Sequence, residues 1–361
     1  MTDKTRKVLF ELMSEMGHEQ VVFSQDASCG YRGIIAIHST VLGPAVGGTR
    51  FWKYASEEEA LVDALRLSRG MTYKCAVAGL PWGGGKSIII DDGTVKDREK
   101  LFRAHGRFID TLGGRYITAE DVGTSPADME IIALETSHVG GRIGKGGDPS
   151  PLTALGVFRS MQASAQYRWG SDELRNKRVA IQGCGNVGFN LARLLHDAGA
   201  QLILSDVDQK KVNRAVENLG AKSASTEGIF SVEADIFSPC ALGGIINDKT
   251  IPLLKAEIVC GAANNQLLEP RHGDALEERG ILYAPDYVAN SGGVLSGGAE
   301  LFGWTIERVR AEVSAIYDTL LLVFAIAKAE GIPTYKAADR LAERRLREGA
   351  LRTSAGSAPE V

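Results

Sequence analysis

Two lysines and an aspartate in the first third of the chain have the types and surroundings needed for acid–base chemistry at an amine or a carbonyl. Lys86 follows three glycines in Gly83-Gly84-Gly85-Lys86 and precedes an apolar, strand-like run at residues 87–90. We expect a glycine-lined turn to present its ammonium group beside that strand. Burial and a second cation lower a lysine pKa toward the range useful for proton transfer, and Lys74 is the candidate second cation. On spacing alone, Lys74 fits a surface charge at a helix end equally well.

A carboxylate that completes such a site occurs in Thr118-Ala119-Glu120-Asp121, at the end of a strand-like run at residues 115–117. Successive side chains of a strand point to opposite faces. If the strand continues, Glu120 and Asp121 therefore face opposite ways, and we expect Asp121 to be the functional acid.

The stretch around Lys86 is not a nucleoside triphosphate P-loop. That motif needs G-x-x-x-x-G-K-[ST], and the position of its first glycine is occupied by Leu80, with the glycine one place early at Gly79. The residues after Lys86 favour a strand, so no helix N-terminus follows to bind phosphate.

A second glycine motif, Gly183-Cys184-Gly185-Asn186-Val187-Gly188, has the G-x-G-x-x-G spacing of a dinucleotide-binding turn. It follows a strand expected at 178–182 and opens a helix expected at 187–198. The glycines let the backbone approach a pyrophosphate, whose charge the first N–H groups of the helix favour. Asp206 closes the next expected strand, 201–205, where a carboxylate accepts the ribose hydroxyls and repels a 2′-phosphate, so we expect NAD rather than NADP. A tight strand-to-helix turn without a ligand is the alternative.

The composition limits the class of protein. With 361 residues, 44% of them hydrophobic and 24% charged, the chain is long enough for about two globular domains and excludes collagen, long coiled coils and wholesale disorder. Forty-one basic and 45 acidic side chains give a net charge of -4, which offers no footprint for nucleic acid or an anionic membrane. The longest apolar run, 320–327, is far shorter than the ~20 residues that span a bilayer.

Cysteine and histidine usage indicates a reduced, metal-free protein. The five cysteines are scattered, with no C-x-x-C pair and no histidine at zinc spacing, so we expect free thiols and no metal. The chain starts without the apolar core of a signal peptide, and we expect a cytoplasmic protein. The six histidines show no catalytic spacing, and we expect each to be structural or to lie on the surface.

The order of elements predicts an α/β protein with two domains. Residues 1–140 mix short β-branched strands (21–23, 33–37 and 87–90) with a helix that a capping box opens at Ser56-Glu57-Glu58-Glu59. Residues 140–151, rich in Gly and Pro, are the expected hinge. From a helix at 153–167 onward, strands and helices alternate through strands expected at 234–237, 258–259 and 281–283. That alternation predicts a doubly wound parallel sheet, a Rossmann domain at 141–332.

The C-terminal part is expected to be helical from about residue 300. A last amphipathic helix after Pro333 should end near Arg347, and residues 333–361 should pack on the first domain. The polar tail 351–361 is expected to be disordered.

Several motifs in sequence order resemble one enzyme family, the amino-acid dehydrogenases that act on glutamate, leucine, phenylalanine and valine. The likeness runs from about residue 8 to 347 and is greatest to the leucine-specific members, notably in residues 238–248 and 269–274. Its shared motifs are Leu42-Gly43-Pro44-Ala45-Val46-Gly47-Gly48-Thr49-Arg50, Gly70-Met71-Thr72-Tyr73-Lys74, Gly83-Gly84-Gly85-Lys86, Tyr116-Ile117-Thr118-Ala119-Glu120-Asp121 and Pro285-Asp286-Tyr287-Val288-Ala289-Asn290.

The resemblance implies reversible oxidative deamination of an L-amino acid to a 2-oxo acid and ammonium, with NAD accepting the hydride. It implies a substrate and oligomerisation domain, a Rossmann domain, a cleft between them that closes on the substrate, and a homo-oligomer. Lys86 matches the catalytic lysine and Asp121 the acid that takes protons from the amino group. Residues matching substrate positions are Lys74, Gly47, Gly48 and Asn264. Further residues matching cofactor positions are Arg50, Thr153, Ala241 and Ala262.

The resemblance also maps a specificity pocket onto Val46, Ala119, Val294 and Gly297. The first three favour a branched aliphatic side chain, whereas Gly297 departs from the leucine-type pocket and leaves room for a larger one. Leucine is therefore the first expectation, with valine and isoleucine as companions. A phenylalanine or tryptophan dehydrogenase is the alternative, and a non-catalytic NAD-binding regulator is a remote one.

Overall fold

The computed structural model describes residues 9–144 and 147–354, and contacts within the chain divide it into two compact units. The first unit takes in the described residues up to Gly147, residues 299–303 and those from Ala342 onward. The second takes in residues 148–298 and 304–341. The first division falls inside the segment 140–151 that we expected to be a hinge, of which residues 145–146 lie outside the described part.

A mixed sheet forms the centre of the first unit. In the described residues its strands run in the order β1 (Gln20–Asp26), β2 (Tyr31–Ser39), β4 (Gly83–Ile90), β3 (Ala45–Trp52) and β5 (Tyr116–Glu120). Strands β3, β4 and β5 are parallel to one another, and β2 is antiparallel to both β1 and β4. The helices before and between the strands are α1 (Leu9–Met16), α2 (Glu57–Val77), α3 (Arg98–Asp110) and α4 (Pro126–Ile132).

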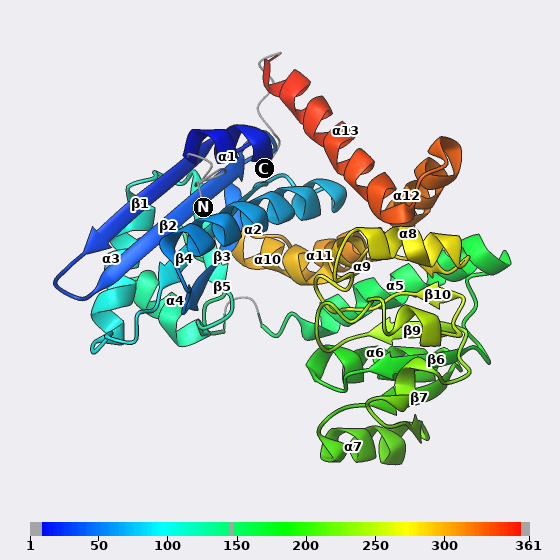
Figure 1. The fold of residues 1–361 in the computed structure, drawn as a ribbon. Helices are drawn as coiled ribbons and strands as arrows, with labels where there is room; N and C mark the ends of the chain where they lie inside the picture. Colours follow the sequence, from blue (N-terminus) through cyan, green and yellow to red (C-terminus); the bar gives the residue numbers. More distant parts are fainter. Residues whose placement is uncertain (1–8, 145–146, 355–361) are drawn as a thin grey trace, which may run out of the picture. The chain divides into compact units, whose positions relative to one another are not determined.

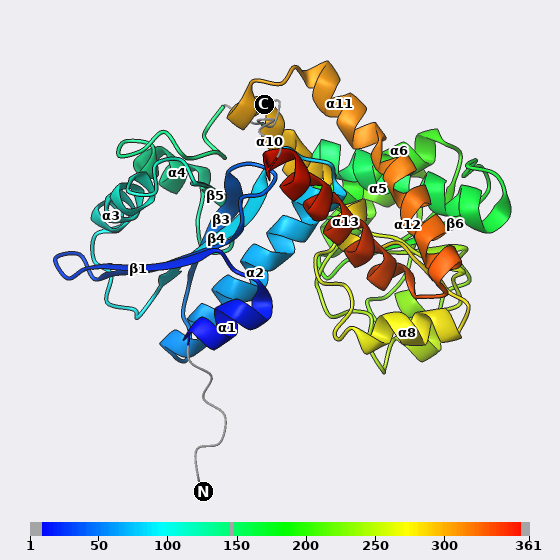
Figure 2. The same cartoon turned by 90° about the horizontal axis from the view of Figure 1, so that it is seen from above.

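Different helices pack on the two faces of this sheet. Even-numbered residues such as Ile34 and Ile88 pack with Leu65 of α2, whereas the odd-numbered Ile89 points to the other face and packs with Phe102 of α3. Figure 2 shows the sheet between α1 and α2 on one side and α3 and α4 on the other. Because successive strand residues alternate, Lys86 points to the α2 face and Ser87 to the α3 face.

The expected glycine turn before Lys86 is wrong, because residues 83–86 are already part of β4. Tertiary contacts explain the glycines. A Cβ on Gly84 would lie 2.0 Å from the backbone nitrogen of Thr72 in α2, and one on Gly85 would lie 2.7 Å from the ring of Tyr116. The glycines therefore let a helix and an aromatic ring approach a strand closely, which local propensity does not reveal.

Helix α2 begins where the predicted capping box placed it, but one hydrogen bond of the box differs. The helix starts at Glu57 with Ser56 as its N-cap, whose hydroxyl accepts the N–H of Glu59. The Glu59 carboxylate accepts the N–H of Ala55 at 2.8 Å rather than that of Ser56. The reciprocal half of the capping box thus reaches back one residue further than predicted.

The second unit contains the predicted doubly wound parallel sheet (Figure 1). In the described residues its strand order is β11 (Leu282–Tyr283), β10 (Ile258–Val259), β9 (Ile236–Pro239), β6 (Arg178–Gln182), β7 (Gln201–Ser205) and β8 (Lys222–Ser223). The chain runs outward from β6 in one direction through β7 and β8 and in the other through β9 to β11. The switch point, where ligands bind such sheets, therefore lies between β6 and β9.

Helices connect and cover these strands, and α5 packs against both α6 and α12. They are α5 (Ser150–Trp169), α6 (Asn186–Asp197), α7 (Gln209–Leu219), α8 (Arg271–Glu278), α9 (Asp286–Ala289), α11 (Ile306–Ser314) and α12 (Ile316–Glu330). Two further helices, α10 (Gly292–Phe302) and α13 (Thr334–Ser354), begin in this unit, and their residues from 299 and from 342 belong to the first unit. Short 3-10 turns occupy Gly228–Phe230 and Ile251–Leu253. No helix of the described residues is long and apolar enough to cross a membrane.

Three predicted boundaries of the C-terminal half are corrected. The strand expected at 234–237 is β9 at 236–239, and the helical part begins at Gly292 instead of about 300. Helix α10 starts with two glycines because the chain of α5 lies against it: a Cβ on Gly292 would be 2.3 Å from the carbonyl oxygen of Leu152. The last helix continues past Arg347 to Ser354, so 351–354 of the predicted disordered tail are helical, and 355–361 lie outside the described residues.

The close approach of α2 to β4 predicts the effect of one added methyl group. Gly84→Ala forces a Cβ into the backbone of Thr72, and we expect it to lower the free energy of unfolding by about 1–3 kcal/mol. Gly70→Ala in α2 is the matched control, because no described atom outside its own stretch of helix lies within 4 Å of the added Cβ. The control should gain about 0.5–1 kcal/mol from the lost backbone freedom of glycine. Equal unfolding midpoints in urea for the two variants would contradict this packing.

Candidate active site

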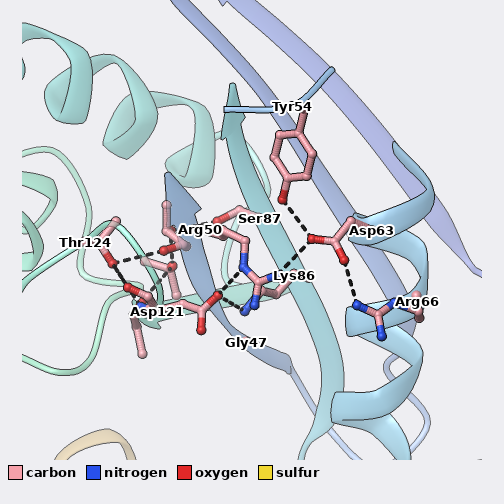
Figure 3. Close-up of polar contacts among 12 residues, drawn as sticks. Gly47, Arg50, Tyr54, Asp63, Arg66, Lys86, Ser87, Asp121 and Thr124 are labelled. Carbon is pink, nitrogen blue, oxygen red and sulfur yellow. Dashed lines mark hydrogen bonds and ion pairs between the residues drawn. The ribbon is translucent and has the colours of Figure 1, made fainter. Parts of the chain in front are cut away.

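The centre of the candidate site is an ion pair between the buried Lys86 and the partly exposed Asp121. Lys86 lies in β4 and is 5% exposed, and its Nζ donates to Asp121 Oδ2 at 2.8 Å. Figure 3 shows the pair, which joins the middle of β4 to the turn after β5 (Tyr116–Glu120). The other oxygen, Oδ1, accepts no hydrogen bond from any residue that the structure describes. One edge of the carboxylate is thus available to a ligand.

Arg50 and Asp63 extend the ion pair to four charges. Arg50, in β3, donates from Nε to the same Oδ2 of Asp121 at 2.8 Å and from Nη1 to Asp63 Oδ2 at 2.9 Å. Asp63 comes from α2 and also accepts from the hydroxyl of Tyr54 at 2.8 Å (Figure 3). The exposed Arg66 also donates to the other oxygen of Asp63, at 2.9 Å. Each of the partly or fully buried charges thus has an opposite partner, which is the condition under which buried charges are tolerated.

Burial and these neighbours shift the pKa values of both central groups. Burial lowers the pKa of the Lys86 ammonium, Asp121 opposes that change, and Arg50 adds to the lowering. For Asp121, burial raises the pKa, but Lys86 and Arg50 outweigh it and hold the carboxyl below its usual range. Asp121 is therefore ionised at neutral pH, while Lys86 loses its proton more readily than an exposed lysine does.

The cation beside Lys86 is Arg50, where the sequence suggested Lys74. Lys74 lies in the last turn of α2 and is partly buried. Two residues earlier, Thr72 lies against Gly84 of β4. Lys74 thus belongs to the helix on the face to which Lys86 points. The register of β3 with β5 pairs Thr49 with Glu120 and so brings Arg50 to Asp121. Spacing in the sequence does not reveal that register.

A turn after β5 fixes the backbone of Asp121. The hydroxyl of Thr124 accepts the N–H of Asp121 at 2.9 Å and donates to the carbonyl oxygen of Thr49 in β3 at 3.0 Å (Figure 3). Strand β5 ends at Glu120, so this turn and not strand alternation directs Asp121 to Lys86. Glu120 instead has its pKa raised by burial and by the charge of Glu300.

The backbone at Gly47 and Gly48 runs between the two charged groups. The pairing of β3 with β4 skips these two glycines and resumes at Thr49. A Cβ on Gly47 would lie 1.7 Å from the carbonyl oxygen of Gly85, and one on Gly48 would lie 2.9 Å from the Cβ of Asp121. Only glycine fits at either position. The candidate pocket residues Val46, which is buried, and Ala119, which is half-buried, flank this stretch on β3 and β5.

The second unit brings most of the expected dinucleotide residues to one edge of its sheet. Residues 183–188 form the turn from β6 into α6, and in the described chain the N-cap Gly185 provides no side-chain cap for the first N–H groups. A Cβ on Gly188 would lie 2.0 Å from the oxygen of Gly183, so helix and turn are in close contact. Asp206 follows β7 and accepts the N–H of Cys184 at 2.7 Å. Open helix N–H groups and a nearby carboxylate fit a dinucleotide.

The remaining expected residues of this unit follow other strands or helices. Ala241 comes after β9 and lies close to the glycine turn, since a Cβ added to Gly183 would be 2.9 Å from its backbone nitrogen. Ala262 comes after β10. Asn264 is exposed, and its side chain accepts from the buried Asn290 at 2.9 Å. Sequence reasoning missed Asn290 as a partner, although it ends one of the shared motifs. The other expected residues are Thr153 in the first turns of α5 and Val294 and Gly297, one turn apart on α10.

No cluster of three or more His, Cys, Asp or Glu side chains in the described residues could hold a metal ion. The five cysteines are free thiols. Asp63 and Thr124, which hold Arg50 and Asp121, were also missed from the sequence. A single aspartate inside a helix or a threonine in a turn carries no signal of that role.

Comparisons with known proteins cover nearly the whole chain. A family model described as "Glu/Leu/Phe/Val dehydrogenase, dimerisation domain" matches residues 18–138. A second, described as "Glutamate/Leucine/Phenylalanine/Valine dehydrogenase", matches residues 147–208 and 204–352. The boundary between the two matches falls near residue 147, where the structure has the first division between its two units.

Individual relatives agree with these matches. The leucine dehydrogenase of Geobacillus stearothermophilus is 58% identical over 341 residues, which is 94% of this chain and 93% of that protein. The valine dehydrogenase of Streptomyces virginiae is 49% identical, with 96% of this chain and 99% of that protein covered. The crystal structure of L-tryptophan dehydrogenase from Nostoc punctiforme superposes with a TM-score of 0.88 at 48% identity and covers 94% of this chain and 99% of that one. With this coverage and identity, the chain belongs to the Glu/Leu/Phe/Val dehydrogenase family.

Proposed function

We propose that the protein catalyses the reversible, NAD-dependent oxidative deamination of a branched-chain L-amino acid to its 2-oxo acid and ammonium. Leucine is the proposed main substrate, with valine and isoleucine as companions. The observation that carries the proposal is the ion pair of the buried Lys86 with Asp121, with one carboxylate oxygen open. The 58% identity to a leucine dehydrogenase supports the substrate class.

Asp121 is the proposed acceptor of the proton on the substrate ammonium group. Lys86 and Arg50 hold its pKa low, so it is ionised when an amino acid binds. Its free Oδ1 then accepts the proton while Oδ2 stays bound to Lys86 and Arg50. The neutral nitrogen that results can donate its lone pair to Cα as the C–H bond breaks, giving an iminium.

Lys86 is the proposed base for the water that converts the iminium to the 2-oxo acid. Its ammonium group must lose a proton to act as a base, and burial makes that easier by lowering its pKa. In its protonated form, it then stabilises the charge that develops on the substrate oxygen. The proposed partner for the substrate carboxylate is Lys74, with the backbone of Gly47 and Gly48 beside it.

The dinucleotide supplies the hydride acceptor for this reaction. Residues 183–188 would hold its pyrophosphate at the N-terminus of α6, and the residues following β9 and β10 would line the same edge. Asp206, at the end of β7, supports a preference for NAD, because a carboxylate at that position binds ribose hydroxyls and repels a 2′-phosphate. Arg50 and Thr153 are the further proposed contacts.

The protein is proposed to work as a homo-oligomer in the cytoplasm. The family description of residues 18–138 as a dimerisation domain supports self-association. Free cysteines in the described residues fit a reducing compartment.

Replacing Lys86 tests its proposed role. Lys86→Ala should reduce kcat for leucine deamination by about 10²–10⁴-fold, because the base for water addition is lost, and leave the affinity for NAD unchanged. In the unchanged protein, kcat/KM should rise with pH through a pKa below that of an exposed lysine. Lys100→Ala, an exposed lysine of the same unit, is the control and should behave as the original. Full activity of Lys86→Ala would refute the assignment.

Exchanging Asp206 tests the cofactor preference. The unchanged protein should use NAD with a far higher kcat/KM than NADP, and Asp206→Ser should reduce that ratio at least tenfold, since the repulsion of a 2′-phosphate is lost. The matched control is Asp208→Asn, which keeps a side-chain acceptor for the N-cap of α7 and should keep the ratio. An equal use of NAD and NADP by the unchanged protein would disprove the preference.

A substrate panel separates leucine from its alternatives. We expect NADH formation with leucine, valine and isoleucine at the highest kcat/KM, and lower values with phenylalanine and tryptophan. Gly297 and the similarity to an L-tryptophan dehydrogenase favour the aromatic alternative. Gly297→Val should then lower activity toward aromatic substrates more than toward leucine, by about ten- to a hundredfold. Highest turnover with tryptophan would replace the leucine assignment, and no NADH from any amino acid would favour a non-catalytic regulator.

A further inference from the structure

A cluster of buried hydroxyl groups surrounds His105 behind the strand that carries Lys86. Its members are on β2, β3, β4, β5 and α3, and each is at most 1% exposed. We call it the hydroxyl cluster, and its residues are Tyr31, Thr49, Ser87, His105, Tyr116 and Thr118. None of them has a part in the proposed chemistry.

The cluster is a connected and uncharged network. Thr49 Oγ1 lies 2.7 Å from Ser87 Oγ, 2.6 Å from Thr118 Oγ1 and 3.0 Å from His105 Nε2. His105 Nδ1 lies 2.8 Å from the hydroxyl of Tyr31. Burial lowers the pKa of His105 to about 3, so its ring is neutral at neutral pH. A buried neutral network of this kind fixes geometry and does not take up protons from the solvent.

Tyr116 connects the network to the active-site backbone. Its hydroxyl lies 3.1 Å from Ser87 Oγ and donates a hydrogen bond to the carbonyl oxygen of Gly47. Gly47 lies where the pairing of β3 with β4 is interrupted, while its pairing with Thr118 of β5 continues. A carbonyl oxygen has two lone pairs, and Tyr116 is a side-chain donor to this one, which ties the Gly47 peptide to the hydroxyl cluster.

Tyr116 also touches the strand just before Lys86. Its ring is the nearest neighbour of Gly85, where an added Cβ would lie 2.7 Å from Cδ2. The carbonyl oxygen of Gly85 in turn packs against Gly47, and Gly48, the next residue of β3, packs against the Cβ of Asp121. One peptide of β3 therefore separates the residue before Lys86 from the backbone of Asp121, and Tyr116 holds that peptide.

We propose that Tyr116 is a positioning residue that sets the spacing between Lys86 and Asp121. The peptide group is planar, so a hydrogen bond to the Gly47 oxygen fixes the orientation of the whole Gly47–Gly48 unit. The ring at Gly85 fixes the strand on the other side. The hydroxyl cluster prevents Tyr116 from moving, because its hydroxyl and its neighbours are all engaged. The inference rests on the roles proposed for Lys86 and Asp121.

Tyr116→Phe tests the proposal by removing one oxygen and keeping the ring. We expect kcat/KM for leucine to fall about tenfold, mainly through kcat, because small displacements of reacting groups are costly. The KM for NAD should not change. Tyr31→Phe is the matched control: it removes a buried hydroxyl from the same cluster but not the bond to Gly47, and its kcat/KM should stay within about twofold of the original.

The pH profile separates positioning from a general loss of stability. Lys86 is faced by Asp121 after β5, by Arg50 of β3 and by Asp63 of α2. A looser Lys86–Asp121 contact weakens the mutual stabilisation of their charged forms, so the pKa of Asp121 rises and that of Lys86 falls. Because kcat/KM rises as Lys86 loses its proton, this rise should move to lower pH in Tyr116→Phe. In Tyr31→Phe it should stay in place.

Gly85→Ala is a second, independent variant, used with the same readouts and decisive if Tyr116→Phe does not fold. Its Cβ displaces the Tyr116 ring without removing a hydrogen-bonding group, and we expect the same loss of kcat/KM and the same shift of the rise in kcat/KM to lower pH. The proposal is overturned if a folded variant of either kind keeps the original kcat/KM and profile, or if Tyr31→Phe loses as much as Tyr116→Phe. Lys86→Ala, measured alongside, shows separately whether the proposed role of Lys86 fails.

Discussion

The active-site half of this protein depends on keeping an ammonium group inside a folded domain at a place where it can still lose its proton. A buried lysine without a partner is unstable, and one bound to a single carboxylate is held tightly in its charged form. Here Lys86 shares one oxygen of Asp121 with Arg50, and Arg50 is balanced by Asp63. Each buried charge has an opposite partner, yet the second cation on Asp121 lowers the pKa of Lys86 and so makes its proton easier to lose.

The surrounding fold is arranged to allow that contact. Lys86 lies in the middle of β4 and Asp121 in the turn after the shorter β5, with the Gly47–Gly48 backbone of β3 between them. Because β5 ends where β3 and β4 continue, the turn after it brings Asp121 to a lysine that is distant in sequence. The α2 face of the sheet carries the charges, and the α3 face carries the neutral hydroxyl cluster. In the second unit, Asp206 after β7 meets the turn after β6, because neighbouring parallel strands end at one edge of their sheet.

Patterns local in sequence predicted much of this arrangement. The two strands of the β6–α6–β7 unit, 178–182 and 201–205, match the prediction to the residue, and the helix expected at 187–198 lies at 186–197, because periodicity and glycine spacing are local. The stretch at 83–86 was expected to turn and is a strand, since its glycines accommodate Thr72 and Tyr116, which no local rule contains. Helix α10 was placed too late for the same reason. Motifs could propose Lys86 and Asp121, but Arg50, Asp63 and Thr124 meet them only through strand register and a turn.

The protonation of Lys86 itself is the most direct test of the four-charge cluster formed by Lys86, Asp121, Arg50 and Asp63. Titration of the Lys86 side chain can be followed by NMR in protein carrying ¹³C-labelled lysine, with the signal assigned by its loss in Lys86→Arg. The cluster predicts a pKa below the ordinary lysine value of 10.5. A Lys86 that titrates at or above 10.5 would contradict it.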